Sequence, residues 1–377
     1  MTKSSKNIQQ RALFKIIFSE LKDPRRTNKG NHKHLLSDII FLVISAVICG
    51  ASDWDEIELF GENQLNWLKK FGQFSNGVPS HDTINRVISS INPKEFSNCF
   101  IKWVNEISRL NKGEVIAIDG KRICGSYDKN AGKSAIHMVS AFASDNGLCL
   151  GQISTNEKSN EITAIPELLD CIAVAGCTVS IDAMGCQTSI AEKIRDKGAN
   201  YILAVKGNQG SLEQGIMDTI KFNKPTDTNS DIDTGHGRIE TRNCRLYNIS
   251  DHVENPGRWK DVRTIIEIEA ERTIKSTGES SIQKRYYITN LDKDAKYINK
   301  AVRNHWAIEN KLHWVLDVTF GEDASRKRKD FAAENFNTIS KIALTMLANE
   351  KSVKASKKSK RLMAAVNQKF REKVLKS

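Results

Sequence analysis

The sequence predicts an α/β fold in which a mixed sheet is preceded by helices and interrupted by a β-rich insertion. Three observations predict it: a helical period in residues 10–110, alternating strands and helices in residues 114–206, and turn-bounded strand-like segments in residues 207–292. The 377 residues suffice for two or three domains. With 39% hydrophobic and 27% charged residues, the composition is that of a soluble globular protein.

The N-terminal helices are indicated by apolar residues that recur every three or four positions. The longest apolar run, Ile39–Ala51, is shorter than the ~20 residues that span a bilayer and therefore predicts a buried helix. The first ten residues lack the apolar core of a signal peptide, so none is expected. Another helix is expected at Pro79–Ile91, with Ser80 as its N-cap. Its outward Asn85 and Arg86 would suit a DNA-reading helix, although plain packing is the more common role.

From residue 114 the apolar segments become short runs typical of strands. Five strands are expected, at residues 114–118, 135–144, 147–155, 177–181 and 200–205. The sequence Asp-Asn-Gly at residues 145–147 predicts a hairpin turn between the second and the third. Helices are expected at residues 161–176 and 187–198, which gives the order β-β-β-α-β-α-β. Because hairpins come first and crossover helices later, the sheet should be mixed.

Residues 207–292 break this order with β-rich segments at 237–249, 262–274 and 284–291, and a helical period returns at residues 294–318. We therefore expect five parts. They are a helical N-terminal domain (1–112), a first core segment (113–206), the β-rich insertion (207–292), a second core segment (293–350) and a basic tail (351–377).

The net charge of +12 is concentrated at the C-terminus. Residues 351–377 contain ten Lys or Arg and one Glu, a net of +9, which leaves +3 for residues 1–350. Such a run can give non-specific affinity for a polyanion, and it can equally be a solvated tail that aids solubility. For a charge run by itself, we favour the solvated tail.

Eight cysteines are scattered along the chain without a Cys-x-x-Cys pair. Cys149, Cys171 and Cys177 lie in apolar segments, so we expect free buried thiols in a reducing cytoplasm and no disulfide framework. The same lack of spacing disfavours a zinc site.

Two aspartates directly follow apolar strands: Asp119, before Gly120, and Asp182, shortly before Gly185. In a mixed sheet of this order the two strands can be neighbours, which would place both carboxylates at one edge. Like charges so close repel each other unless a divalent cation lies between them. Each Asp alone is better explained as a turn cap, because Asp-Gly is a common turn pair. Two of them in this order favour metal binding.

A third carboxylate is expected on the helix after the insertion. At 100° per residue, Glu309 lies within about 60° of Val302 and Leu312, on the apolar face of that helix. A lone buried charge is costly, so this Glu needs a salt bridge or a metal. The acids that follow it remain alternatives: Asp317, Glu322 and Asp323.

At this point several segments resemble one known group. They are AIDGKRICGS, HMVSAFA, NEITAIPELLD, VSIDAMGCQ, YILAVKGNQ, GHGRIETR and HWAIENKLHWVLDVTFGEDASR, which extend from about residue 113 to about residue 337. In order and content they resemble the DDE-type insertion-sequence transposases of bacteria, in the branch that includes the H-repeat-associated proteins. The part from LKDPRR to PSHDTINR resembles the helical domain associated with that group.

The resemblance implies a ribonuclease-H-like core in which Asp119, Asp182 and Glu309 hold two Mg²⁺ ions, with Mn²⁺ as a substitute. It implies a DNA transposase that cleaves insertion-sequence ends and joins them to target DNA by two-metal phosphodiester chemistry. The implied partner is double-stranded DNA, held by a homodimer in the synaptic complex. The implied location is the bacterial cytoplasm, at the nucleoid and away from membranes.

Many relatives carry Tyr-x2-Arg-x3-Glu-x6-Lys around the third acid, and here those positions hold Val302, His305 and Leu316. The residues expected to contact DNA are Lys121, Arg122, Lys206, Asn208, Gln209, His236, Arg238, Arg242 and Arg303. Ordinary turn chemistry explains the residues after the fifth strand, and those of GHGRIETR, equally well.

Two other functions remain open. One is a ribonuclease-H-like nuclease that hydrolyses DNA without strand transfer, and the other is a decayed or domesticated DNA-binding protein. The insertion and the helical N-terminal domain favour the transposase over the nuclease, because hydrolysis alone needs neither. The presence of all three acids argues against a decayed protein.

Overall fold

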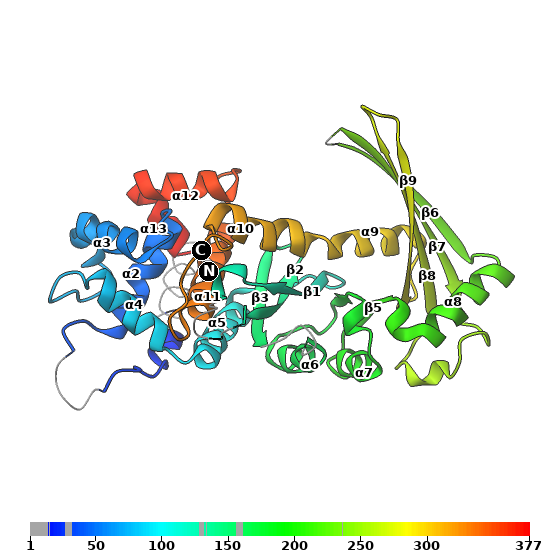
Figure 1. Cartoon of the computed structure of the whole chain (residues 1–377), viewed down its shortest axis with the longest axis horizontal. Coiled ribbons are helices and arrows are strands. Elements are labelled where there is room, and N and C mark those ends of the chain that lie inside the picture. Colours follow the sequence, from blue (N-terminus) through cyan, green and yellow to red (C-terminus); the bar gives the residue numbers. More distant parts are fainter. Residues whose placement is uncertain are drawn as a thin grey trace.

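A nine-stranded mixed sheet, in the order β3-β2-β1-β4-β5-β9-β8-β7-β6, runs through the molecule (Figure 1). The computed structural model describes residues 14, 16–26, 32–127, 132, 134–155, 161–235 and 237–377. Helices cover both faces of the central strands, and a group of helices lies beyond the β3 edge (Figure 1). The α/β class expected from the sequence is confirmed.

The five strands expected between residues 114 and 206 are all present. They are β1 (Val115–Arg122), β2 (His137–Ala143), β3 (Leu148–Thr155), β4 (Thr178–Ile181) and β5 (Asn200–Val205). Strands β1, β2 and β3 pair antiparallel, whereas β4 and β5 run parallel to β1. The order 3-2-1-4-5 with this mixture of directions is the ribonuclease-H-like arrangement, and it follows from hairpins first and crossover helices later.

The crossover helices α6 (Glu161–Cys171) and α7 (Thr188–Asp196) lie on one face of these strands. Gly198, with a φ of +69°, ends the second of them, as its position in the sequence suggested. Helix α9 (Ala295–His305) crosses the other face, from the outer strands back to β1 (Figure 1). The central sheet is therefore buried on both sides, which explains its nearly continuous apolar strands.

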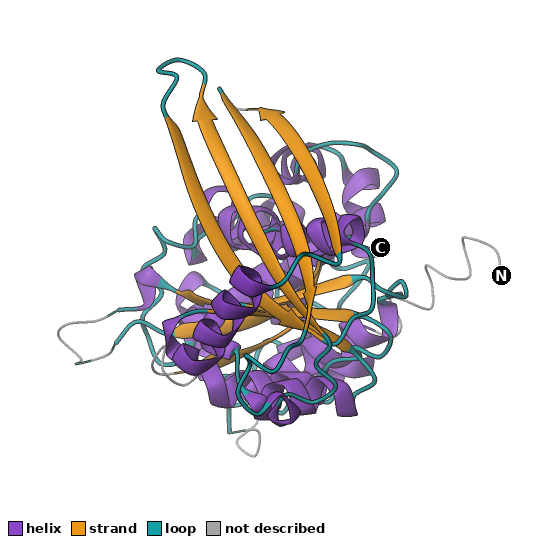
Figure 2. Cartoon of the chain, turned by 90° about the vertical axis from the view of Figure 1, so that its right-hand side faces the viewer, coloured by secondary structure: helices purple, strands orange, loops and turns teal. Residues whose placement is uncertain are grey.

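The insertion extends the same sheet. Its strands are β6 (Asp227–Gly235), β7 (Arg238–Asn248), β8 (Thr264–Ile274) and β9 (Ser280–Thr289), and β9 pairs antiparallel with β5. We call β6–β9 the arm, because its strands project beyond the rest of the molecule (Figure 2). The sequence analysis missed β6 and the preceding helix α8 (Gly210–Phe222). Strand β6 is polar and mostly exposed, so it carries no apolar alternation.

The helical region contains α2 (Leu36–Ile48), α3 (Trp54–Leu68), α4 (His81–Ser90) and α5 (Pro93–Ile107). The long apolar run forms α2 and is almost wholly buried, as expected. Ser80 caps α4 by accepting a hydrogen bond from the amide of Thr83, also as expected. Asp55, Glu58 and Asp82 all lie within 4 Å of His81 at the start of α4. These carboxylates would repel a phosphate backbone, so the structure favours the packing role for α4.

The C-terminal segment is not a solvated tail, contrary to our expectation. It forms α12 (Lys357–Val366) and α13 (Gln368–Leu375), and Phe370 and Val374 are buried in the main core. Arg361 donates to the carbonyls of Val47 and Thr319, so it joins the end of α2 to the end of α10 (Trp314–Phe320). Basic residues that look solvated in the sequence thus satisfy helix-end carbonyls.

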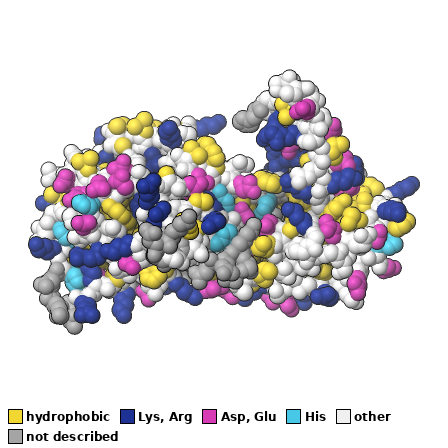
Figure 3. Space-filling view, in the orientation of Figure 1, with side chains coloured by type: hydrophobic (Ala, Val, Ile, Leu, Met, Phe, Trp, Pro, Cys, Tyr) yellow, Lys and Arg dark blue, Asp and Glu magenta, His cyan; other side chains and the backbone are white. Residues whose placement is uncertain are grey.

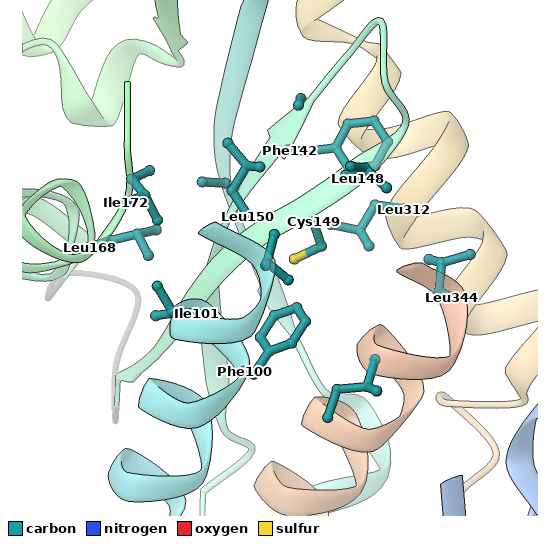
Figure 4. Packing of buried hydrophobic residues seen from close by; sticks show 14 of the residues in the cluster. Phe100, Ile101, Phe142, Leu148, Cys149, Leu150, Leu168, Ile172, Leu312 and Leu344 are labelled. Atoms are coloured by element: carbon teal, nitrogen blue, oxygen red, sulfur yellow. The ribbon is translucent and has the colours of Figure 1, made fainter. Parts of the chain in front are cut away.

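One buried apolar cluster unites the N-terminal helices with the sheet. Figure 4 shows Phe100 of α5 facing Cys149 of β3, with Leu344 of α11 (Ala332–Asn349) and Leu312 nearby. Because Leu312 belongs to the segment that carries Glu309, the position of that segment depends on the core between the helices and the sheet.

Two further observations concern the described residues. No helix among them is long and apolar enough to cross a membrane. All eight cysteines are free thiols, and five of them are buried, in agreement with the expectation of unpaired cysteines.

Candidate active site

Asp119 and Asp182 lie side by side at one edge of the central sheet. Strand β1 pairs in parallel with β4 as far as Ile118 and Ile181, and the next residue along each segment is one of the two aspartates. Asp182 follows the end of β4 as expected, whereas Asp119 lies within β1, which continues to Arg122 and pairs there with β2, so the expectation that Asp119 ends its strand was wrong. Neighbouring strands are ~4.8 Å apart, which brings the two carboxylates within strong Coulomb interaction. The neighbouring strands expected from the sequence are present, because the β3–β4 crossover through α6 returns the chain next to β1.

Burial and neighbouring charges raise the pKa of Asp119. Its side chain is 21% exposed. Burial is the largest cause, and the charges of Asp182, Glu309 and Glu161 add to it, so the pKa rises from 3.8 to about 7. The amide of Gly120 donates to the carboxylate and partly opposes the rise. The carboxylates are therefore mutually unfavourable without a cation between them.

Asp182 is held by the loop that follows its strand. Its Oδ1 accepts hydrogen bonds from the amides of Met184 (3.1 Å) and Gly185 (3.4 Å). The turn capping considered in the sequence analysis is thus present, but it uses only Oδ1. The same carboxylate still raises the pKa of Asp119, so capping and proximity to Asp119 coexist.

Two residues that we expected to contact DNA support this loop. Asn208 donates to the carbonyl of Ala183 at 2.6 Å, and Gln209 donates to the carbonyl of Cys186 at 2.9 Å. These bonds tie the turn after β5 to the turn after β4, in agreement with the turn-chemistry interpretation. Lys206, which precedes them, is exposed.

Glu309 is exposed, contrary to the expectation that it lies on a buried helix face. Residues Glu309–His313 form a π-helical turn, η7, between α9 and α10. A π-turn contains more residues than an α-turn, so the projection at 100° per residue loses its phase there. Ile308 and Leu312 take the buried positions. Partial enclosure still raises the pKa of Glu309, although Arg285 opposes the shift.

The rival acids Asp317 and Glu322 are occupied by Lys121. Lys121, which we expected to contact DNA, is 14% exposed and forms ion pairs with both carboxylates. Glu322 also accepts a hydrogen bond from Asn337 of α11. This network fastens β1 to α10 and α11. Asp323, the third rival, is exposed.

Sequence reasoning missed several groups around Asp119. His137 of β2 is hydrogen-bonded to Glu161, the first residue of α6, and both are buried. A Cβ at Gly120 would collide with both side chains, so the glycine lets this pair approach β1 closely. The segment EITAIPELLD predicts the helix, but only the tertiary structure places Glu161 beside β1.

Two histidines also face the aspartates. His313 Nδ1 lies 3.6 Å from Asp119 Oδ2, and burial lowers the pKa of His313 to about 3, so the ring is neutral. Burial also lowers the pKa of His305, whereas the charge of Asp182 opposes the shift. His313 Nε2 and His305 Nδ1 are buried without a hydrogen-bond partner. The spacing of His305 and His313 along the sequence did not indicate that both would lie beside the aspartates, because the π-turn begins between their positions.

The remaining residues expected to contact DNA are spread around the arm and β1. Arg122 is exposed at the end of β1, and Arg303 of α9 pairs with Asp231 and Asp233 of β6. Arg238 and Arg242 line a pocket of about 670 Å³ between the arm and α9. His236 lies outside the described residues.

The donor set fits a divalent cation at the aspartate pair. Within the described ranges, no three His, Cys, Asp or Glu side chains are gathered closely enough to hold a metal ion together. The half-buried, mutually repelling carboxylates of Asp119 and Asp182 nevertheless supply the oxygen ligands that Mg²⁺ prefers. Glu309 lies near enough to affect the pKa of Asp119, although its side chain is exposed.

Comparisons with known proteins identify the family of the chain. The family model "Transposase DDE domain" matches residues 110–346, and the model "DDE_Tnp_1-associated" matches residues 16–104. A protein of Escherichia coli O157:H7 named "Putative transposase YncI" is 46% identical over 360 residues, which cover 94% of this chain and 92% of that protein. The "H repeat-associated putative transposase YhhI" of Escherichia coli K12 is 43% identical over 364 residues, 95% of this chain and 96% of that protein.

Among solved structures, the piggyBac transposase synaptic complex with hairpin DNA matches with a TM-score of 0.49 at 13% identity. The match covers 100% of this chain and 84% of that chain. The family models span the N-terminal helices as well as the sheet, and the relatives are similar over nearly their whole length. The chain belongs to the family of DDE transposases.

Proposed function

We propose that this protein cleaves the ends of an insertion sequence and joins them to target DNA, with Asp119, Asp182 and Glu309 as the metal-binding acids. The observation that carries the proposal is the parallel register of β1 and β4, which sets two carboxylates next to each other at the sheet edge. The raised pKa of Asp119 supports it, because a divalent cation would offset the burial of the charged carboxylate and its repulsion from Asp182, which together raise this pKa.

The protein's own groups would hold and orient the reacting parts. Two divalent ions, Mg²⁺ or in its place Mn²⁺, would supply activation of the attacking oxygen and stabilisation of the leaving oxygen. The strands make Asp119 and Asp182 rigid, and the hydrogen bonds to Oδ1 orient Asp182. The neutral ring of His313 packs beside Asp119 without adding positive charge that would repel a cation.

Glu309 is the proposed third acid in preference to Asp317. Glu309 is one of the charges that raise the pKa of Asp119, whereas Asp317 is bound to Lys121. Its exposed position on the π-turn leaves the carboxylate available to turn toward the aspartates. π-turns are frequent at functional sites.

We also propose the division of labour among the parts of the chain. Residues 1–112 would bind the transposon ends, residues 113–206 and 293–350 would form the catalytic core, and residues 207–292 would contact DNA through the arm. The substrate is double-stranded DNA held by a homodimer. The arm and the helical region favour strand transfer over simple hydrolysis, because hydrolysis requires only the core.

The experiment measures Mg²⁺-dependent nicking and DNA affinity on a plasmid that carries the DNA flanking the coding region. Asp119→Asn, Asp182→Asn and Glu309→Gln should each abolish nicking while affinity in EDTA stays within a few-fold of wild type. Asp196→Asn, at an exposed position on α7, is the matched control and should nick normally. Asp317→Asn should act mainly through stability, because it leaves Lys121 short of one partner.

Normal nicking by either aspartate variant would contradict the site. If a folded Glu309→Gln protein still nicks and a folded Asp317→Asn protein does not, then Asp317 is the third metal-binding acid and Glu309 is not. Nicking without joined products, in the presence of target DNA, would favour the nuclease over the transposase. Binding without nicking by the wild-type protein would favour the decayed DNA-binding protein; the relative named "Inactive transposase YbfQ" is 59% identical over 56 residues.

A further inference from the structure

The pocket between the arm and α9 is strongly basic. Its basic lining residues are Arg238, Arg242, Arg272, Arg285, Arg303 and Lys311, and its acidic ones are Glu240 and Glu309. Strands β7, β8 and β9 supply one wall, and α9 with the π-turn supplies the other. Figure 3 shows Lys and Arg side chains on the arm beside the hollow that separates it from the body. The excess of cations indicates an anionic ligand.

Arg242 has hydrogen-bonding capacity that the protein leaves unused. The residue is 8% exposed, and its Nε and Nη2 are buried without a hydrogen-bond partner. Glu240 lies 3.3 Å from Nε, which gives an ion-pair contact but no hydrogen bond. Buried guanidinium groups are normally fully bonded, because an unsatisfied donor costs its whole desolvation energy. Arg242 is thus prepared for an acceptor that enters the pocket.

Three of the other cations of the pocket already have partners within the protein. Arg303 is paired with Asp231 and Asp233 of β6, and Lys311 donates to the carbonyl of Ser144. Arg285 stacks over Trp306 at 4.6 Å and donates to Gln283. These three side chains are therefore already held by contacts within the protein.

Arg242 lies in the middle of the inner face of the arm. Across the sheet its neighbour on β8 is Ala270, and the neighbour of Ala270 on β9 is Gln283. The side chain of Ala270 beside Arg242 is small, and both residues line the pocket. Arg238 lies on the same face, four residues before Arg242 along β7. The register therefore builds a cleft with arginine donors on its floor.

The pocket joins the candidate active site, because Glu309 and Asn310 of the π-turn line its wall. We propose that it binds a single-stranded segment of the DNA substrate next to the scissile bond, with Arg242 donating to a phosphate oxygen. This inference rests on the proposed function, because it takes DNA as the substrate. The volume of about 670 Å³ is that of a small-molecule site, which holds one or two nucleotides and is too small for a duplex.

The test uses the full-length protein in EDTA, so that no cleavage occurs. Fluorescence polarisation would measure affinity for a short labelled oligothymidine and for a duplex of the same length, at several salt concentrations. Arg242→Gln should weaken oligothymidine binding at least tenfold and reduce the slope of log affinity against log salt by about one. Duplex affinity should change by less than threefold. Arg258→Gln, which removes an exposed arginine outside the pocket, should change neither.

A second variant, Ala270→Leu, fills the pocket and leaves its charge unchanged. Ala270→Leu should also weaken oligothymidine binding, and it tests the proposed site if Arg242→Gln does not fold. If the folded variants bind oligothymidine as tightly as the wild-type protein does, the proposal is wrong. An equal loss for single strand and duplex would assign Arg242 to ordinary backbone contact and would also overturn it. Because binding is read without metal, a failure of nicking would count against the proposed chemistry and leave this result standing.

Discussion

The burial of Asp119 and its repulsion from Asp182 predict that Asp119→Asn stabilises the protein in the absence of a divalent cation. The substitution keeps the shape of the side chain and an oxygen that can still accept from the amide of Gly120, but it removes the charge that Asp182 opposes. Catalytic acids are commonly destabilising, because their environment serves the ligand and not the fold. The expected loss of nicking should therefore accompany a gain in stability.

The magnitude follows from the shift of the pKa of Asp119. A rise from 3.8 to about 7 is worth roughly 4 kcal/mol at 1.36 kcal/mol per unit. Because the folded-state pKa lies above the unfolded value, the charged form destabilises the fold. The penalty is absent below pH 3.8, grows as the pH rises and is complete above about pH 7. Roughly 2–3 kcal/mol of it accrues between pH 5 and pH 8.

Urea unfolding in EDTA at pH 5 and pH 8 measures this effect. Asp119→Asn should exceed the wild type in unfolding free energy by roughly 2–4 kcal/mol at pH 8 and by clearly less at pH 5. Adding Mg²⁺ at pH 8 should stabilise the wild type and leave the variant nearly unchanged, since binding to the folded state alone raises stability. Asp196→Asn, at the exposed position on α7, should follow the wild type throughout.

A variant that is less stable than the wild type at pH 8 in EDTA would refute this reasoning. It would show that the charge of Asp119 is compensated in the folded protein, and that burial and the charge of Asp182 do not penalise it there.

Two further predictions concern parts of the fold that support the site. Phe370→Ala, at a side chain that is 5% exposed, should lower the unfolding free energy by about 3–5 kcal/mol. Val366→Ala, at a side chain that is 80% exposed, should change the unfolding free energy by less than about 0.5 kcal/mol. Equal effects of the two variants in urea titrations would support the interpretation of residues 351–377 as a solvated tail. Gly120→Ala should cost about 1–3 kcal/mol, because its Cβ meets the buried His–Glu pair, and a melting temperature equal to that of wild type would show that the pair moves aside freely.

The strands that carry the two aspartates were predictable because their signals are local. An apolar run before Asp119 or Asp182 marks a buried strand within a few residues, although β1 continues past Asp119 to Arg122, and the turn at residues 145–147 marks the hairpin. The short crossovers through α6 and α7 limit where β4 and β5 can lie, so their proximity to β1 follows from chain connectivity. The helix at Ile39–Ala51 and the Ser80 cap are local in the same sense.

The predictions that failed depend on contacts between distant parts of the chain. The burial of Glu309 was wrong because a π-turn, which no period of apolar residues reveals, shifts the helix face there. The solvated tail was wrong because Arg361 meets carbonyls more than 300 residues away in sequence, at Val47. The polar strand β6 and the joining of β9 to β5 depend on strand pairing across the insertion.

The sequence by itself therefore determined the five strands between residues 114 and 206, their connections and the two aspartates, since each rests on neighbouring residues and short links. Only the tertiary structure decided the environment of those aspartates. It placed Glu161 and His313 beside Asp119, bound Lys121 to the rival acids and left Arg242 unsatisfied in the arm pocket. The physical reason is that charge, burial and hydrogen-bond satisfaction depend on which side chains approach through space, and a linear pattern records only those that approach along the chain.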